Sequence, residues 1–145
     1  MSQVSDVLRI RADVSELAHV RQFIRDRSRL AGANRQTTDD MVQAVDELVT
    51  NSIVHGYKGG QGAIEVEVDI RDPSLIVRLR DRARAFDPTS VAPKDTSVPL
   101  SERPAGGMGI HLSREMTDEM TYQRIDGQNE TTLVKKFSSE GDGPC

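Results

Sequence analysis

The chain has 145 residues, of which 36% are hydrophobic and 29% charged, and this length and composition fit one soluble globular domain. Its net charge of -4 argues against a nucleic-acid partner, and no apolar run approaches the roughly 20 residues that a membrane span needs. The N-terminus lacks an apolar secretory core, and the lone Cys145 can close no internal disulfide. We therefore expect one cytoplasmic domain over residues 1–145, with short tails at 1–6 and 138–145.

The first part of the chain predicts a strand followed by an amphipathic helix. A short apolar stretch at residues 7–10 favours the strand. Asp13 and Glu16 then have the spacing of a helix N-cap and its capping-box partner, and apolar side chains recur at helical spacing up to Gly32. We expect a helix over residues 14–30.

A second helix is predicted to begin at residues 37–40, which carry capping and acidic side chains, and to end at the glycines of residues 56–60. At about 100° per residue, its apolar side chains gather on one broad face, while Glu47 and Asn51 lie on the polar side. That broad face comprises Met41, Val42, Ala44, Val45, Leu48, Val49, Ser52 and Ile53.

Strands with one buried and one solvated face are predicted in the second half of the chain. Residues 64–70 and 75–79 alternate apolar and polar or charged side chains on either side of a turn at residues 72–73. A weaker pattern of the same kind pairs residues 119–125 with residues 130–137. Both patterns are typical of antiparallel hairpins.

Between the hairpins, residues 88–105 contain several prolines, so neither a helix nor an inner strand is expected there. A loop of this length in a compact domain is more often a functional lid or a disordered segment than an inert connection. Glycines at 106–109 follow, and Met108, Leu112 and Met116 recur every four residues, which predicts a third helix beginning on the glycines. The predicted class is α+β: a two-layer sandwich with three helices on one face of a mostly antiparallel mixed sheet, and a lid loop.

Glu47, Asn51 and His55 stand four residues apart and form one stripe along the second helix. The side-chain carbonyl of an asparagine suits Mg²⁺, and a glutamate one turn away can accept a proton from an attacking hydroxyl. The same spacing also describes a solvated helix face with a packed histidine. The stripe alone therefore does not decide between the two.

Asp81 continues the alternation of Leu75, Val77 and Leu79, so its carboxylate is expected on the buried face. A buried carboxylate is costly without a hydrogen-bond donor, and the amino group of an adenine would supply one. Alternatively, the strand ends at Arg80 and Asp81 begins a turn.

The glycines at 106–109 join the long loop to a predicted helix N-terminus. Glycine lets the backbone approach a ligand closely, and the first N–H groups of a helix form an anion site. A flexible joint with an ordinary helix N-terminus is the alternative. No G-x-x-x-x-G-K-[ST] loop occurs anywhere in the chain.

Taken together, these segments resemble a known superfamily. Residues 46–57, Asp-Glu-Leu-Val-Thr-Asn-Ser-Ile-Val-His-Gly-Tyr, resemble the N-box of the Bergerat-type ATPases, which include gyrase, heat-shock chaperone, histidine-kinase and mismatch-repair ATP domains. Residues 81–88 resemble their second box, and residues 106–112 their glycine-rich third box. Length and element order are most similar to the anti-sigma-factor serine kinases of bacterial partner-switching systems, over residues 7–137.

The resemblance implies a protein serine kinase that uses ATP and Mg²⁺. Asn51 is then expected to hold Mg²⁺, Glu47 to act as general base on a partner's serine hydroxyl, and Asp81 to recognise the adenine amino group. A lid at residues 88–105 would close over the phosphates. The other residues expected to contact the nucleotide are His55, Ala85, Phe86, Arg103, Gly106, Gly107, Met108, Gly109, Ile110 and Thr132.

The resemblance also implies two protein partners. One is an anti-sigma-factor antagonist that accepts phosphate on a serine, and the other is a sigma factor or other regulated protein that the kinase sequesters. Family members commonly form homodimers, so self-association stays an open expectation. Neither direct nucleic-acid binding nor membrane binding is expected.

The second box departs from the family pattern, because Ala83 and Ala85 stand where glycine is usual. Alanine adopts left-handed backbone conformations only at a cost, and its methyl group would crowd a bound base. This departure keeps an alternative open: a nucleotide-dependent or nucleotide-free protein-binding switch without kinase turnover. The catalytic domain of a histidine kinase is disfavoured, because the chain has no room for a dimerisation domain bearing a phospho-accepting histidine.

Overall fold

The computed structural model describes residues 3–90 and 107–137. The predicted tail at 138–145, Arg103 and Gly106 lie outside the described residues, as does most of the predicted lid. Within the described part, the chain forms three α-helices and a five-stranded sheet. In chain order the elements are β1 (Gln3–Arg11), α1 (Leu17–Ala31), α2 (Arg35–Asn51), β2 (Ala63–Arg71), β3 (Ser74–Asp81), α3 (Gly107–Met116), β4 (Glu119–Ile125) and β5 (Gln128–Lys136).

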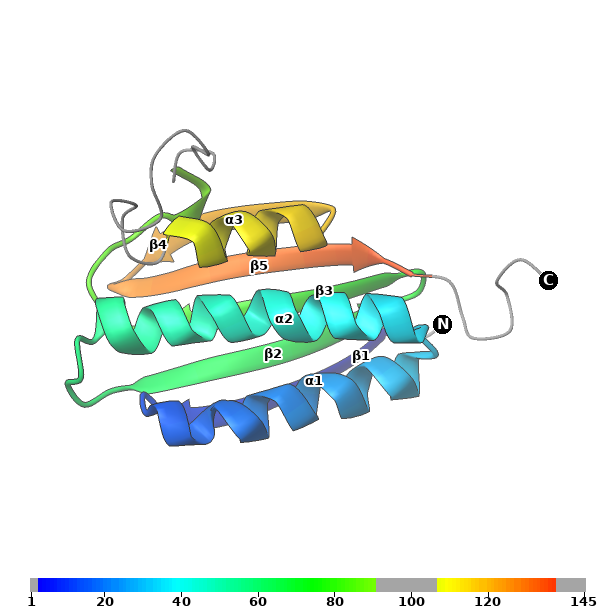
Figure 1. Ribbon diagram of the computed structural model, residues 1–145, viewed down its shortest axis with the longest axis horizontal. Coiled ribbons are helices and arrows are strands. Elements are labelled where there is room, and N and C mark those ends of the chain that lie inside the picture. The colour runs from blue at the N-terminus through cyan, green and yellow to red at the C-terminus, as the bar shows by residue number, and fades with distance from the viewer. Residues whose placement is uncertain (1–2, 91–106, 138–145) are drawn as a thin grey trace.

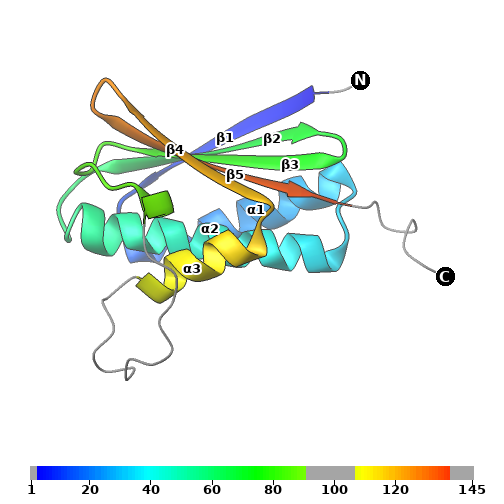
Figure 2. The same ribbon diagram turned by 90° about the horizontal axis from the view of Figure 1, so that it is seen from above.

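The strands are ordered β1-β2-β3-β5-β4, and every described pairing is antiparallel. All three helices lie on one side of the sheet and leave its other face open (Figures 1 and 2). The predicted α+β class is therefore confirmed, in a sheet without a parallel pair among the described strands. β1 begins at Gln3, so part of the predicted tail at residues 1–6 belongs to the sheet.

Helix α2 lies between α1 and α3 on the sheet (Figure 1). Its side chains Met41 and Val45 are fully buried, as are Val66, Val77 and Leu133 on the facing strands. Burying an aliphatic side chain of this size contributes roughly 1.5–3 kcal/mol, which makes this interlayer core the main source of stability. No helix in the described part of the chain is long and apolar enough to cross a membrane.

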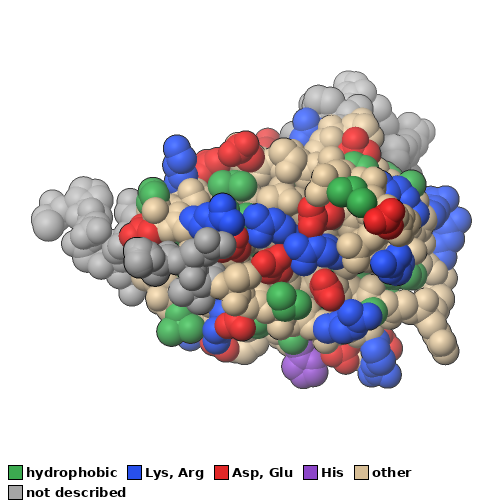
Figure 3. All heavy atoms as spheres, turned by 180° about the vertical axis from the view of Figure 1, so that it is seen from behind, with side chains coloured by type: hydrophobic (Ala, Val, Ile, Leu, Met, Phe, Trp, Pro, Cys, Tyr) green, Lys and Arg blue, Asp and Glu red, His purple; other side chains and the backbone are tan. Residues whose placement is uncertain are grey.

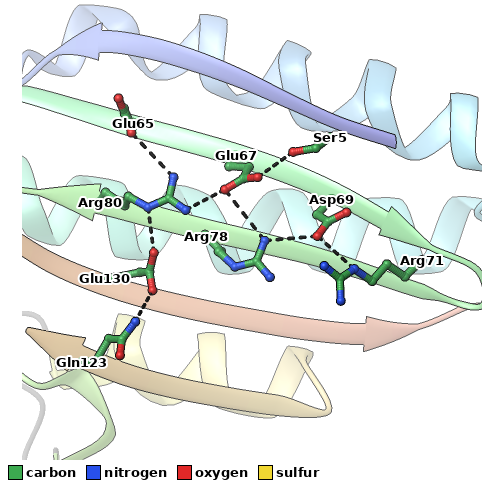
Figure 4. Close-up of polar contacts among 9 residues, drawn as sticks. All are labelled: Ser5, Glu65, Glu67, Asp69, Arg71, Arg78, Arg80, Gln123 and Glu130. Carbon is green, nitrogen blue, oxygen red and sulfur yellow. Dashed lines mark hydrogen bonds and ion pairs between the residues drawn. The ribbon is translucent and has the colours of Figure 1, made fainter. Parts of the chain in front are cut away.

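Acidic and basic side chains alternate over the open face of the sheet (Figure 3). Arg80 on β3 donates to Glu67 on β2 at 2.6 Å and to Glu130 on β5 at 2.7 Å (Figure 4). Arg78 donates to Asp69 at 3.2 Å in the same network. The charges that mark the solvated face in the sequence thus pair across neighbouring strands.

These contacts shift the pKa values of two glutamates. A hydrogen bond from Ser5, together with Arg80, holds the pKa of Glu67 below its ordinary value of 4.5. Burial by itself raises the pKa of Glu130, but hydrogen bonds from Gln123 and Arg80 outweigh it and lower that pKa overall. Both carboxylates therefore favour the folded state while they are ionised.

Because folding lowers both pKa values, the stabilisation is present above the ordinary value of 4.5 and is lost as pH falls through the folded values. Urea denaturation from about pH 6 to about pH 3 should show wild type losing more stability than Glu67→Gln. The control is Asp39→Asn, which removes an exposed carboxylate and should keep the wild-type dependence. Identical pH dependence in Glu67→Gln and wild type would contradict this account.

Candidate functional site

Glu47 and Asn51 lie one turn apart on α2, and both are partly exposed. Two turns before Asn51, the carbonyl of Ala44 accepts a hydrogen bond from Ser113 of α3 at 2.8 Å. Residues at these spacings share a helix edge, so Glu47 and Asn51 lie on the edge of α2 that runs along α3. Within the described residues, neither side chain has a hydrogen bond or ion pair, which leaves both available to a ligand.

The end of α2 widens into a π-helical turn, Ser52–Gly56, that includes His55. The turn closes with a hydrogen bond from the Tyr57 N–H to the Ser52 carbonyl at 2.8 Å. Single π turns are frequent at functional sites. This one directs the Ser52 hydroxyl to the carboxylate of Asp81, at 2.8 Å.

Asp81 is the last residue of β3, and its side chain lies on the buried face of the sheet, as the alternation predicted. Its Oδ1 accepts from the N–H of Ala83 at 3.0 Å and from Asn129 at 2.9 Å, and its Oδ2 accepts from Ser52. Protein donors therefore satisfy the carboxylate, and its burial alone does not require a ligand.

The sequence reasoning missed Asn129, which is 6% exposed on β5 directly opposite Asp81. A signal was present, because Asn129 and Thr131 share the buried parity of Leu133, and polar side chains at buried positions need partners. Thr131, not Thr132, faces the helices. Thr132 pairs with Arg78 on the open face of the sheet, so the structure does not bring it to Asp81.

Tyr57 joins three elements at this end of the sheet. Its hydroxyl donates to the carbonyl of Ala63 at 2.8 Å and accepts from the N–H of Arg82 at 2.8 Å. Burial is the main cause of its raised pKa. A Cβ on Gly62 would lie 2.2 Å from the tyrosine ring, so a glycine is needed for the ring to fit. Tyr57 thus ties the end of α2 to β2 and to the segment after β3.

The strain expected at Ala83 and Ala85 is absent. Among non-glycine residues in the described part, only Lys58 and Asp126 have positive φ angles, so both alanines adopt ordinary backbone conformations. Ala83 is 5% exposed, and a Cβ on Gly56 would lie 3.0 Å from the Ala83 methyl group. That methyl group therefore fills space beside a glycine of the π turn.

The remaining predicted site residues lie in the segment after β3 and at the start of α3. Ala85 and Phe86 are exposed after β3. Gly107 begins α3, as predicted, and Met108, Gly109 and Ile110 continue its first turn. The start of α3 and the end of α2 lie at the same end of the molecule (Figures 1 and 2). The N-terminus of a helix can bind an anion, so α3 places such a site at the end of the molecule where α2 carries Asn51.

The donor set suits a magnesium ion that is held partly by a ligand. No group of His, Cys, Asp and Glu side chains able to hold a metal occurs among the described residues. Mg²⁺ commonly takes only one or two protein oxygens and completes its octahedron with phosphates and water. The side-chain oxygen of Asn51 fits that role.

Comparisons with known proteins agree with this geometry. The profile of a family described as "Histidine kinase-like ATPase domain" matches residues 10–135. An anti-sigma F factor of Clostridium kluyveri is 31% identical over 99 residues, which is 67% of this chain and 68% of the relative. A serine-protein kinase RsbW of Bacillus cereus is 25% identical over 134 residues, which is 90% of this chain and 82% of the relative.

A solved structure shares the fold. The crystal structure of the RsbU and RsbW domains of a Mycobacterium tuberculosis protein superposes with a TM-score of 0.66 at 18% identity, and the match covers 94% of this chain. This chain spans 32% of the length of that chain. At this identity the likeness shows the fold alone.

The contact between Ala83 and the π turn can be tested by substitution. Gly56→Ala should cost roughly 1–3 kcal/mol of unfolding free energy, because the two methyl groups would overlap. Adding Ala83→Gly should recover most of that loss, with Ala83→Gly alone as the reference. Urea denaturation of the four proteins measures the coupling. Additive effects of the two substitutions would refute the contact.

Proposed function

Since the chain belongs to the histidine kinase-like ATPase domain family, we propose that it is a protein serine kinase that binds Mg-ATP between α2 and the sheet. Two features at one end of the molecule support the proposal. Asp81 offers a fixed carboxylate on the buried face. On α2, Glu47 and Asn51 offer side chains that have no partner among the residues that the structure describes. We call the surroundings of Asp81 the fixed end of the site, and Glu47 and Asn51 the open end. The single observation that carries the proposal is that both ends lie at the same end of the molecule.

The adenine lies at the fixed end. Asp81 accepts a hydrogen bond from the exocyclic amino group, while Ser52, Ala83 and Asn129 hold the carboxylate still. A carboxylate held by several donors keeps one orientation, which suits recognition of a donor-bearing base.

The phosphates lie at the open end. Asn51 would supply its side-chain oxygen to Mg²⁺, and the N–H groups at the start of α3, from Gly107, would bind the phosphate oxygens. Such an ion would supply neutralisation of phosphate charge during transfer. Arg103 and Gly106, outside the described residues, stay predicted contacts in this region.

Glu47 acts as general base. It lies one turn before Asn51 on the same helix edge, so a phosphate bound through a metal on Asn51 would lie within its reach. The carboxylate would accept the proton of the attacking serine hydroxyl as the serine oxygen bonds to the γ-phosphorus and the bond from that phosphorus to the β–γ bridging oxygen breaks, so that ADP leaves. Phosphoryl transfer depends mostly on positioning and charge neutralisation, and these residues provide both.

The names of two relatives support the proposed partners. One relative is an anti-sigma F factor and another is a serine-protein kinase RsbW. This chain accordingly sequesters a sigma factor, and it phosphorylates a small antagonist on serine. Phosphorylation of the antagonist then decides which partner the kinase holds.

A protein-binding switch without turnover is the second candidate, and one observation favours it. The carboxylate of Asp81 is satisfied by protein donors, so the fold does not need a nucleotide there. In that case regulation of the partner would survive loss of Glu47.

Phosphoryl transfer tests the proposal. With Mg-ATP and the cognate antagonist, wild type should phosphorylate one serine, mapped by mass spectrometry. Glu47→Gln should lower the transfer rate by about 100-fold or more, because the base is lost, and should leave ATP affinity nearly unchanged. Gln43→Ala, exposed one turn earlier on α2, is the matched control and should match wild type.

Two results would count against the proposal. No transfer by wild type, under conditions where it binds both ATP and the antagonist, would contradict the kinase and leave the switch as the better account. A Glu47→Gln protein that transfers phosphate as fast as wild type would contradict the assignment of Glu47 as general base.

A further inference from the structure

Asn129 makes more side-chain contacts around Asp81 than the proposed function uses. Its Nδ2 lies 2.9 Å from Asp81 Oδ1, 3.2 Å from the carbonyl of Ala83 and 3.1 Å from the carbonyl of Arg84. All of these neighbours are acceptors, so only the NH₂ end of the amide can face them. Asn129 thus holds the Asp81 carboxylate and the segment after β3 at once.

The other end of the amide is also held. Asn129 Oδ1 accepts from the Tyr122 hydroxyl at 2.5 Å and from Arg124 Nη1 at 2.9 Å. Arg124 also donates to the carbonyl of Ala83 at 3.2 Å. Because both groups come from β4, the β4–β5 hairpin fixes the amide against rotation.

This arrangement makes the two oxygens of Asp81 unequal. Oδ1 accepts from the N–H of Ala83 and from Asn129, whereas Ser52 is the only donor to Oδ2 among the described residues. Each carboxylate oxygen has room for about two hydrogen bonds, so the remaining acceptor position is on Oδ2.

We propose that Asn129 is a positioning residue for nucleobase selectivity. By occupying Oδ1 and holding the segment after β3, it presents Oδ2 as a fixed acceptor to the exocyclic group of a purine. An amino group at that position donates to Oδ2, while an oxo group would place two acceptors face to face. The site therefore takes adenine and rejects an oxopurine such as hypoxanthine. This inference rests on the proposed ATP site.

The hydrogen bonds of Asn129 also hold the backbone of the segment after β3, which contains Ala83 and Ala85. Asn129 binds the carbonyls of Ala83 and Arg84, so a side chain on β5 determines the course of this segment. Selectivity then depends on a residue that touches Asp81 but not the base.

Isothermal titration with Mg-ATP and Mg-ITP measures the selectivity directly. Wild type should bind ATP at least about tenfold more tightly than ITP, because ITP carries an oxo group where ATP carries an amino group. Asn129→Ala should weaken ATP binding and bring the ATP-to-ITP affinity ratio towards one, since Asp81 Oδ1 loses one of its two donors and the carbonyls of Ala83 and Arg84 lose their contact with β5. Thr121→Ala, exposed on β4, is the control and should keep the wild-type ratio.

Thermal unfolding shows whether Asn129→Ala folds. A second variant tests the inference if it does not. Tyr122→Phe removes one donor to Asn129 Oδ1 and leaves the contacts with Asp81 in place, so it should lower the ratio by a smaller factor. An unchanged ratio in folded Asn129→Ala, or in Tyr122→Phe where Asn129→Ala does not fold, overturns the inference. Failure of wild type to bind ATP overturns the proposed function and this inference with it, whereas a failed inference alone leaves ATP binding intact.

Discussion

The candidate site depends on one buried carboxylate. Asp81 lies where the end of α2, the end of β3 and the start of β5 meet, and donors from these three places converge on it. A buried charge is stable only when such donors satisfy it, so the carboxylate determines how the helix layer and the sheet join at this end. The π turn brings Ser52 to it, and Tyr57 ties the adjoining segments together.

The same constraint divides the site into the fixed end around Asp81 and the open end at Glu47 and Asn51. Around Asp81 the polar groups are already paired, which gives a ligand a fixed acceptor to meet. Glu47 and Asn51 have no protein partners in the described part of the chain, so their order depends on what binds. A nucleotide that spans both ends would be oriented by Asp81 at the fixed end, and its phosphates would react beside Glu47 and Asn51 at the open end. This division is consistent with the kinase relatives that the chain resembles.

Periodicity in the sequence predicted the elements well, because the helices and the β2–β3 hairpin each bury one regular face. It also placed Asp81 on the buried side. Periodicity could not predict contacts between positions far apart in the sequence, such as the hydrogen bond between Asn129 and Asp81, which are 48 residues apart. Which of Thr131 and Thr132 faces the helices depends on the strand register, because a shift of one residue moves a side chain to the opposite face of the sheet. The easy fit of Ala83 depends on its neighbour Gly56, which no local pattern reveals.

The most direct test of the account is the affinity of Asp81→Asn for Mg-ATP, measured by isothermal titration beside wild type. The substitution keeps the size of the side chain but replaces one acceptor oxygen with a donor, so it disturbs both the convergence of donors and the acceptor offered to adenine. We predict that wild type binds Mg-ATP and that Asp81→Asn, still folded by thermal unfolding, loses at least about tenfold in affinity. Equal affinity in the two proteins would contradict the central claim that Asp81 recognises the nucleotide.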